Sequence, residues 1–454
     1  MAKAAGTKSK AKPKAEITAE VKEKEVKKMK NYHEMTKEEL QAEKALLDEQ
    51  YKHWQSKGLK LDMSRGKPSS EQLDLSMPIF DILDCEASMR CLNGVETRNY
   101  GGLEGLVEAR KMMSQIMDCD PEQVIIGGNS SLNMMFDTVI RGYSLGFAGC
   151  TPWCKLDKVK WLCPVPGYDR HFAITQHFGF EMINIPMDDN GPDMDMVEKL
   201  VSEDDSIKGM WCVPKYSNPT GIIYSDEVVK RIASLKPAAK DFRVFWDNAY
   251  AVHHLYDEKN EIPNILALSE DAGNESMVFE FASTSKITFA GAGVAAMAMN
   301  NKNREEMKKT MTVQTIGYDK VNQLRHARFF TNVTTMDEHM KKHASLLRPR
   351  FELVLEALER DLRPVGCGDW IAPRGGYFIT YNAPSGTATR IVDLCGLAGV
   401  VLTPAGAPFP YHMDPDDSVI RFAPSFPSLE ELKDAADIFT VCARIATVAK
   451  LLHS

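Results

Sequence analysis

The residues best suited to chemistry in this sequence stand directly after short apolar runs that read as β-strands. Ligands of open α/β sheets bind outside the carboxyl ends of the strands, so groups that follow successive strands meet at one edge. Five such groups occur, and together they offer glycines, hydroxyls, phenols, an amide, a carboxylate and an amine. They occupy residues 127–131, 166–170, 216–221, 247–250 and 283–286.

The first group, Gly127-Gly128-Asn129-Ser130-Ser131, lies between a predicted strand and a predicted helix. Glycines let a ligand approach the backbone, a helix N-terminus offers free N–H groups, and serine hydroxyls add donors. This combination suits a phosphate monoester. Taken alone, the same residues also suit an ordinary helix N-cap after a glycine turn, and they match neither a Walker loop nor the G-x-G-x-x-G fingerprint.

A carboxylate, two phenols and an amide follow the other strands. Asp247 ends an apolar run, where an ionised carboxylate needs a cationic or hydrogen-bonding partner, and a protonated pyridine nitrogen would serve. Tyr250 and Asn218 could both bond a phenolate oxygen, and Tyr168 offers a flat face for stacking. Each has an ordinary alternative: a helix cap for Asp247, turn chemistry for Asn218 and a half-buried loop aromatic for Tyr168.

Lys286 follows three small hydroxyl residues and precedes a glycine-rich apolar stretch. A partly desolvated lysine loses basicity and becomes a nucleophile toward carbonyls. For this residue taken singly, a surface lysine before a strand is the alternative. Combined with a carboxylate for a ring nitrogen, a phosphate cup and a stacking ring, Lys286 predicts a pyridoxal 5′-phosphate site with a Schiff-base lysine.

The order of these groups resembles the class I aminotransferases among the fold-type I pyridoxal-phosphate enzymes. Over residues 31–454 the sequence is similar to the type Ic aspartate aminotransferase subgroup, in the strings RGKPS, NYGG, GGNSSLNMM, PVPGYDRHF, DNAYAVHHL, STSKITFAGAGVA and IRFAPSFP. The resemblance implies that Lys286 binds the cofactor and moves the proton. It also implies that Asp247 pairs with the ring nitrogen and that Asn218 and Tyr250 bond the ring's 3-oxygen.

By the same resemblance, Tyr168 stacks on the ring, and the chain forms a homodimer with shared active sites. The phosphate ligands it implies are Asn129, Ser130, Ser131 and Ser283, with Tyr100 from the neighbouring subunit. The substrate ligands it implies are Arg421 for the α-carboxylate, together with Asn218 and with Gly66 at the mouth. Many family members carry an arginine eight residues after the lysine, where this sequence has Val294. The phosphate cup would then depend on backbone N–H groups and hydroxyls, or on a cation from elsewhere.

The resemblance implies transamination between an amino acid, expected to be aspartate, and a 2-oxo acid, expected to be 2-oxoglutarate, with ping-pong kinetics. A dicarboxylic substrate needs a second cation, and Arg170 is the candidate because it follows Tyr168 by two residues. Arg65, Arg325 and Arg374 are rivals, and each of the four could instead form a surface ion pair. Alternatives for the whole protein are an aspartate decarboxylase or other lyase, an aminotransferase of other amino acids, and a cofactor-binding sensor domain.

Composition narrows the function classes. The chain has 454 residues and a net charge of −8, but residues 1–30 hold ten lysines and four glutamates, which leaves −14 for the rest. An acidic body argues against nucleic acid as the main ligand, and the lysine-rich tail reads as disordered. The longest weakly polar run, residues 289–299, is far shorter than the ~20 residues of a membrane span. Ten cysteines without a C-x-x-C pair predict reduced thiols, no zinc site and a cytoplasmic location.

A mainly parallel sheet covered by helices on both faces must position these groups, because near-continuous apolar strands alternate with amphipathic segments such as 225–235. The expected strands span residues 124–126, 159–163, 182–185, 210–213, 244–246, 277–281 and 294–299. Capping boxes at Thr36/Glu39 and Ser428/Glu431 predict helices near both ends of the chain. We expect an α/β fold in four parts: the tail (1–30), an N-terminal part of the small domain with an arm (31–99), a large cofactor-binding domain (100–325) and a small α+β domain (326–454).

Overall fold

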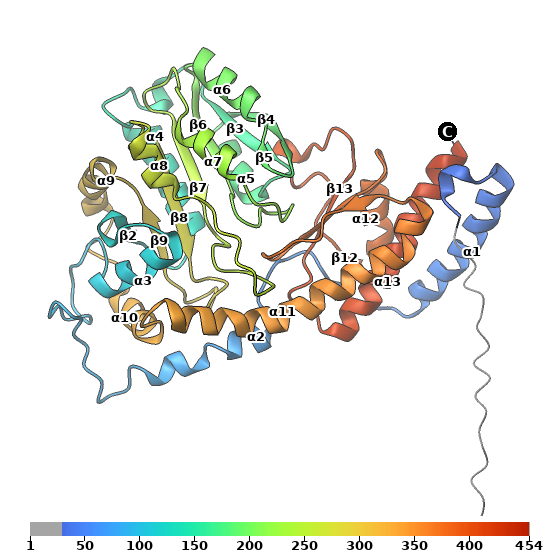
Figure 1. Ribbon diagram of the computed structural model, residues 1–454, viewed down its shortest axis with the longest axis horizontal. Coiled ribbons are helices and arrows are strands. Elements are labelled where there is room, and N and C mark those ends of the chain that lie inside the picture. The colour runs from blue at the N-terminus through green and yellow to red at the C-terminus, as the bar shows by residue number, and fades with distance from the viewer. Residues whose placement is uncertain (1–29, 454) are drawn as a thin grey trace, which may run out of the picture.

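The computed structural model describes residues 30–453, and Figure 1 shows its two parts joined by one long helix. Apart from Lys30, the lysine-rich tail predicted at residues 1–30 lies outside the described residues.

The larger part is built on an eight-stranded sheet of strand order β2-β9-β8-β7-β6-β3-β4-β5. Neighbouring strands among β4, β3, β6, β7 and β8 run parallel, whereas β9 is antiparallel to both of its neighbours and β5 to β4. The strands are β2 (Val124–Ile126), β3 (Lys160–Val165), β4 (Glu181–Asp188), β5 (Gly191–Pro192), β6 (Ile207–Cys212), β7 (Arg243–Asp247), β8 (Val278–Ser283) and β9 (Ala295–Ala298). All seven expected strands are confirmed, and only the two-residue β5 was not expected.

Helices cover both faces of this sheet. Because side chains alternate along a strand, Val244 and Trp246 of β7 lie in one hydrophobic core and Phe245 in another on the opposite face. One core includes residues of α3 (Val107–Met117), α6 (Met194–Glu203), α7 (Asp226–Ala233) and α8 (Ile265–Asp271). The other includes residues of α4 (Ser131–Leu145), α5 (Asp169–His177) and α9 (Asn301–Gln314). The predicted mainly parallel sheet between helical layers is therefore confirmed.

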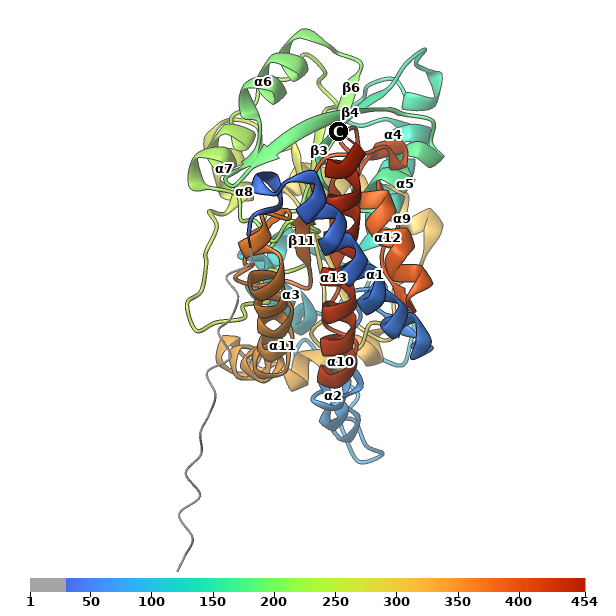
Figure 2. The same cartoon turned by 90° about the vertical axis from the view of Figure 1, so that its right-hand side faces the viewer.

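The smaller part is α+β and is built from both ends of the chain. Figure 2 shows α1 (Lys37–Ser56) beside α13 (Leu429–His453), and Leu40 and Leu47 of α1 share a core with α13. That core also includes α12 (Ala388–Leu397) and two small sheets. One sheet is antiparallel, with β10 (Asp369–Trp370), β11 (Ile379–Asn382) and β13 (Val419–Phe422), and the other pairs β1 (Leu61–Asp62) with β12 (Val400–Val401) in parallel.

Hydrogen bonds at the helix starts confirm the predicted caps. The backbone N–H of Thr36 donates to Glu39 Oε2 over 2.7 Å, while the N–H of Glu39 donates back to Thr36 Oγ1 over 3.2 Å. Ser428 and Glu431 form the same reciprocal pair ahead of α13. Such caps satisfy backbone donors that have no partner within the helix.

One continuous helix, α11 (Val333–Asp361), joins the two parts. Its Met336 and Met340 belong to a core of the large sheet, whereas its Phe351 and Val354 belong to the core of the smaller part. The proposed boundary between residues 325 and 326 lies inside α10 (Lys320–Phe329), just ahead of this helix that serves both cores, and the four-part division stays a proposal. The remaining helices are α2 (Ser70–Asp74) and α10 (Lys320–Phe329), with short 3₁₀ turns at Tyr32–Glu34, Met77–Asp81, Pro121–Gln123, Trp153–Lys155, Arg363–Val365 and Pro410–His412.

Within residues 30–453, none of the helices combines the length and the apolar character that crossing a membrane requires. The ten cysteines are all free thiols, and six of them are buried.

Candidate active site

A cavity of about 600 Å³ opens at the carboxyl edge of the large sheet, where Phe378 and Arg421 of the smaller part complete its wall. It has the size of a small-molecule site. The predicted site residues that line it are Gly66, Ser130, Ser131, Tyr168, Arg170, Asn218, Asp247, Tyr250, Ser283, Lys286 and Arg421. Asn129 and Tyr100 are the two predicted ligands that do not line it.

Asp247, the last residue of β7, offers one unpaired carboxylate oxygen at this cavity. Its Oδ2 lies 3.0 Å from His171 Nε2, and the His171 ring stacks on Trp211 with centroids 4.5 Å apart. Its Oδ1 is buried and has no hydrogen-bond partner. A buried acceptor left without a donor costs free energy, so this oxygen fits a ligand that brings a cationic N–H group, such as a protonated pyridine nitrogen.

Lys286 shares the cavity with Asp247. Its Nζ lies 4.8 Å from the ring centroid of Tyr250. Burial lowers the pKa of Lys286 below its usual value, and the nearby negative charge of Asp247 partly opposes that shift. A lysine with a lowered pKa is more often present as the neutral amine, which is the nucleophilic form.

The two tyrosines at this end of the cavity are held protonated by burial. Burial raises the pKa of Tyr250 well above its usual value. Burial, followed by the charge of Asp247, raises the pKa of Tyr168 to about 12. Each phenol can therefore donate a hydrogen bond at neutral pH. Tyr168 is the N-cap residue of α5, and it lines the cavity from that position.

Serine hydroxyls and a helix N-terminus lie together at the cavity. Ser130 caps α4 by accepting a hydrogen bond from the backbone N–H of Asn133, and Ser131 is the first residue of that 15-residue helix. Ser283 Oγ donates to Ser285 Oγ over 3.1 Å, and Ser285 also lines the cavity. The group thus brings three predicted serines and one unpredicted serine to a helix end that attracts anions.

At two positions, Asn129 and Val294, the side chain does not take the phosphate-binding place that the family's pattern implies. The Asn129 side chain donates to the carbonyl of Gly291 over 3.2 Å, so only its backbone lies close to the serine group, where its carbonyl accepts from Ser285 Oγ. Val294, which stands where relatives carry an arginine, is buried in a hydrophobic core and does not line the cavity. Tyr100 is 83% exposed, so its predicted role in a neighbouring subunit stays a prediction.

Arg421 in β13 presents its guanidinium from the smaller part of the molecule. Its Nη1 donates to Asn218 Oδ1 over 3.2 Å and to Asp169 Oδ1 over 3.1 Å. Its Nε and Nη2 donate to Thr403 Oγ1 over 3.3 and 3.2 Å, and the guanidinium lies over the ring of Phe378 at 4.9 Å. These contacts fix the fork in a geometry that suits a carboxylate. They also direct Oδ1 of Asn218 at Arg421, which leaves its NH₂ group for another acceptor.

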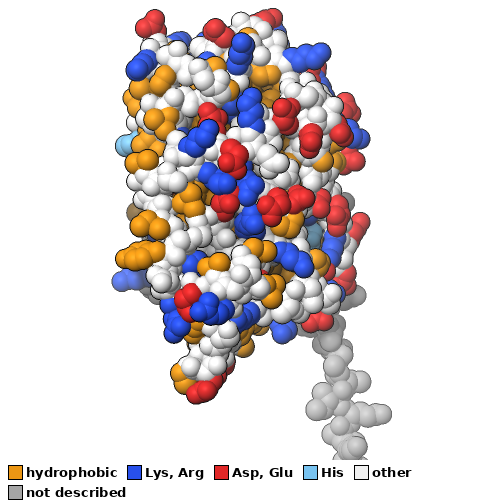
Figure 3. All heavy atoms as spheres, turned by 90° about the vertical axis from the view of Figure 1, so that its left-hand side faces the viewer, with side chains coloured by type: hydrophobic (Ala, Val, Ile, Leu, Met, Phe, Trp, Pro, Cys, Tyr) orange, Lys and Arg blue, Asp and Glu red, His pale blue; other side chains and the backbone are white. Residues whose placement is uncertain are grey.

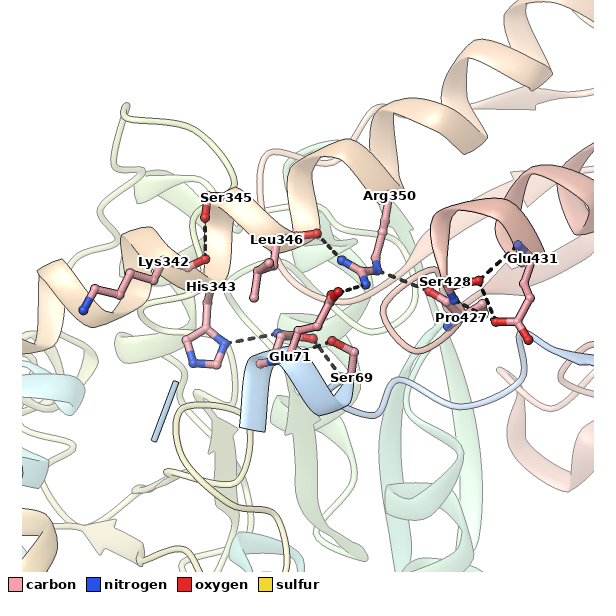
Figure 4. A network of polar contacts seen from close by, with 11 residues as sticks. Ser69, Glu71, Lys342, His343, Ser345, Leu346, Arg350, Pro427, Ser428 and Glu431 are labelled. Atoms are coloured by element: carbon pink, nitrogen blue, oxygen red, sulfur yellow. Dashed lines mark hydrogen bonds and ion pairs between the residues drawn. The ribbon is translucent and has the colours of Figure 1, made fainter. Parts of the chain in front are cut away.

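The mouth of the cavity is shaped by residues 64–66. Gly66 is needed there because a Cβ atom would lie 2.6 Å from Cζ of Phe378. The short helix α2 that follows is tied to α11, as Figure 4 shows for Glu71 and Arg350, whose ion pair measures 2.7 Å. In the same network the amide of Gln72 lies 3.1 Å from His343 Nδ1. Through these contacts α11 fixes the position of α2 and of residues 64–66, which shape the mouth of the cavity.

The structure separates the four arginines proposed for a second carboxylate. Arg65 and Arg170 line the cavity. Arg325 donates to Asn322, and Arg374 forms an ion pair with Glu258, and neither of these two lines the cavity. The Arg170 side chain is 63% exposed and lies 4.0 Å from a carboxylate oxygen of its neighbour Asp169.

Sequence reasoning missed four contacts of this site. His171 and Asp169 stand inside the string PVPGYDRHF, and their places in the first turn of a helix after Tyr168 could have pointed to them. Ser285 stands one residue before the lysine. Thr403 had no local signal, because it meets Arg421 only through the pairing of the small sheets and loops of the smaller part.

Comparisons with known proteins agree with this geometry. A family model of aspartate amino-transferases matches residues 35–454. An aspartate aminotransferase of Corynebacterium glutamicum is 47% identical over 392 residues, which cover 86% of this chain and 90% of the relative. The crystal structure of an aspartate transaminase from Corynebacterium glutamicum superposes with a TM-score of 0.90 at 44% identity, covering 92% of this chain and 99% of that one.

A more distant structure shares the fold alone. The multiple substrate aminotransferase of Thermococcus profundus superposes with a TM-score of 0.69 at 20% identity, over 87% of this chain and 92% of that one. With a family model that covers nearly all of the described residues and a relative at 47% identity, the chain belongs to the aspartate aminotransferase family, of aminotransferase fold-type I.

Proposed function

We propose that this protein catalyses pyridoxal-phosphate-dependent transamination between aspartate and a 2-oxo acid, with 2-oxoglutarate as the expected acceptor. One observation carries the proposal: the unpaired buried oxygen of Asp247 and the amine of Lys286 share one cavity. Bound pyridoxal phosphate supplies a carbonyl that condenses with amines and a ring that accepts electrons from the substrate. The aspartate aminotransferase relative at 47% identity supports the same reaction.

The residues that would hold the cofactor divide by chemistry. Asp247 would accept a hydrogen bond from the ring nitrogen through Oδ1, while His171 keeps the carboxylate oriented through Oδ2. Asn218 and Tyr250 would donate to the ring's 3-oxygen, and Tyr168 would pack on the ring. Ser130, Ser131 and Ser283 would bind the phosphate at the N-terminus of α4, with the backbone at Asn129 close by and Tyr100 reaching in from a second subunit.

Lys286 would serve both as the attachment point and as the proton carrier. Because burial lowers its pKa, its Nζ is a better acceptor for the α-proton of the substrate than an exposed lysine and can donate that proton again in the next step. Arg421 would bind the α-carboxylate with its fixed guanidinium fork, which orients the α-hydrogen toward Lys286. Phe378 and Gly66 would exclude water from this side of the cavity.

The second carboxylate of aspartate would bind Arg170. Support for Arg170 is its place in the cavity wall beside Tyr168. Arg65 lines the same wall and remains the alternative.

A homodimer and a cytoplasmic location belong to the same proposal. On the face shown in Figure 3, hydrophobic side chains stand among groups of acidic and basic ones. Large apolar side chains that a partner subunit could cover include Tyr100, Val313 and Ile316, which are 83%, 91% and 63% exposed. Sedimentation equilibrium tests the dimer, because it measures the mass of the protein in solution.

The cysteines support a cytoplasmic location, since ten free thiols are typical of a reducing compartment.

The test is a donor screen against 2-oxoglutarate with purified protein, repeated with Lys286→Ala. We expect glutamate and oxaloacetate from aspartate with the wild type. Lys286→Ala is expected to lose all measurable turnover and the absorbance of the lysine-bound cofactor. Lys302→Ala, on the exposed start of α9, is the matched control and should behave as the wild type. Alanine and carbon dioxide as products would replace the proposal with β-decarboxylation, and near-wild-type transamination by Lys286→Ala would contradict the role of the lysine.

A further inference from the structure

The guanidinium that we assign to the substrate α-carboxylate already binds a carboxylate of this chain. Asp169 Oδ1 accepts a hydrogen bond from Arg421 Nη1 over 3.1 Å, and the two side chains are 25% and 8% exposed. Their positions differ by 252 residues in sequence, so the contact exists only in the folded chain. Asp169 also lines the cavity.

A substrate α-carboxylate and Asp169 would compete for the same donor group. Nη1 of Arg421 is shared between Asp169 and Asn218, whereas Nε and Nη2 both donate to Thr403. Bidentate binding of a carboxylate needs two parallel N–H groups of the fork. Two carboxylates at one guanidinium also repel each other, so a bound substrate favours movement of the more exposed one, Asp169.

A second cation, Arg170, lies close enough to Asp169 to become its main partner. Arg170 Nε lies 4.0 Å from Asp169 Oδ2, and the Arg170 side chain is 63% exposed and therefore free to adjust. The side chain of Asp169 can turn from Arg421 to Arg170 without moving α5, because both residues belong to the first turn of that helix. The N-terminus of α5 favours a negative charge in either position.

We propose that Asp169 is a displaceable internal ligand of Arg421, which occupies the α-carboxylate site before substrate binds and passes to Arg170 when substrate enters. The inference rests on the proposed function. Asp169 thereby lowers the affinity for every amino acid and 2-oxo acid, since all of them share the carboxylate that competes with it at Arg421. The second carboxylate of a dicarboxylic substrate would in addition share Arg170 with Asp169.

A purely structural role for Asp169 makes the opposite prediction. If Asp169 only braced Arg421, removing its charge would loosen the guanidinium and raise KM. If it only stabilised the N-terminus of α5, its removal would lower thermal stability and leave KM unchanged. The sign of the change in KM therefore separates displacement from both alternatives.

The experiment uses the holoenzyme and the isosteric variant Asp169→Asn. KM and kcat are measured for aspartate, and the dissociation constant of propionate, an inert monocarboxylate, is measured by spectral titration. We expect KM and the propionate constant to fall about threefold to tenfold, as for the loss of one partly exposed ion pair, with kcat within about twofold of the wild type. Asp226→Asn is the matched control, because Asp226 is likewise the first residue of a helix but lies away from this cavity.

A second variant tests the transfer to Arg170. Arg170→Ala should weaken propionate binding in the wild-type background, because Asp169 then has no alternative partner, and should have little effect when Asp169→Asn is already present. Unchanged or raised KM in Asp169→Asn would overturn the inference while transamination still stood. Tighter propionate binding by that variant, in a protein that fails to transaminate, would retain the displacement and reject the proposed function.

Discussion

Replacing His171 by phenylalanine would test whether the partner of Asp247 is what keeps this carboxylate suitable for a cationic ring. Phenylalanine preserves the stack on Trp211, whose centroid lies 4.5 Å from that of His171, and removes only the 3.0 Å contact to Oδ2. With Oδ1 already unpaired, the variant leaves both oxygens of a buried carboxylate without a donor in the cofactor-free protein. A buried carboxylate without any donor is poorly stabilised and loses the contact that orients it toward a pyridinium nitrogen.

The size of the effect follows from the bond that is lost. A hydrogen bond to a charged group contributes about 1.5–3 kcal/mol. At 1.4 kcal/mol per tenfold change, we expect cofactor affinity to fall about 10- to 100-fold. The assay is equilibrium dialysis of the apoenzyme against pyridoxal phosphate, together with the thermal midpoint of the apoenzyme, which should also fall.

Two further variants make this result interpretable. His171→Gln keeps a side-chain donor near Asp247 and should recover part of the affinity. His177→Gln removes an exposed imidazole from the last turn of the same helix and should bind cofactor as the wild type does. If His171→Phe bound cofactor within about twofold of the wild type and melted at the same temperature, the reasoning about Asp247 would be refuted.

Two predictions concern the mouth and the core. Gly66→Ala places a Cβ 2.6 Å from Cζ of Phe378, so we expect a higher KM for aspartate and about 1–3 kcal/mol lower stability. Gly396→Ala is the control, because its Cβ would meet nothing within 4 Å. A KM for aspartate equal to that of the wild type in Gly66→Ala would argue against a tight mouth. Burial raises the pKa of Glu280 to about 8, so the unfolded chain loses this proton near pH 4 and the folded chain only near pH 8. Stability should therefore fall as pH rises through that window. Glu280→Gln keeps an acceptor for Asn248 and should show a smaller fall in thermal midpoint between pH 5 and 8 than the wild type. Parallel curves of thermal midpoint against pH for the two proteins would contradict the raised pKa of Glu280.

Local sequence patterns were enough to predict the large sheet and most of the residues at its edge. Short apolar runs such as residues 244–246, separated by amphipathic segments, predict buried parallel strands, and the group that follows each parallel strand emerges at the same edge. Ser130, Asn218, Asp247 and Lys286 could therefore be predicted to meet, because each is placed by a local pattern of strand followed by turn. The caps at Thr36 and Ser428 were likewise local, and the structure has both.

The way in which the smaller part closes the site could not be predicted from local sequence patterns. Among the four candidate arginines, Arg325 and Arg374 bond elsewhere while Arg65 and Arg170 line the cavity, and nothing in the local sequence distinguishes them. The contact of Asp169 with Arg421 joins the first turn of one helix to a strand of another sheet. Such pairings depend on how separate elements pack together, and their geometry is set by the shared cores and by α11, not by the residues next to them in the chain.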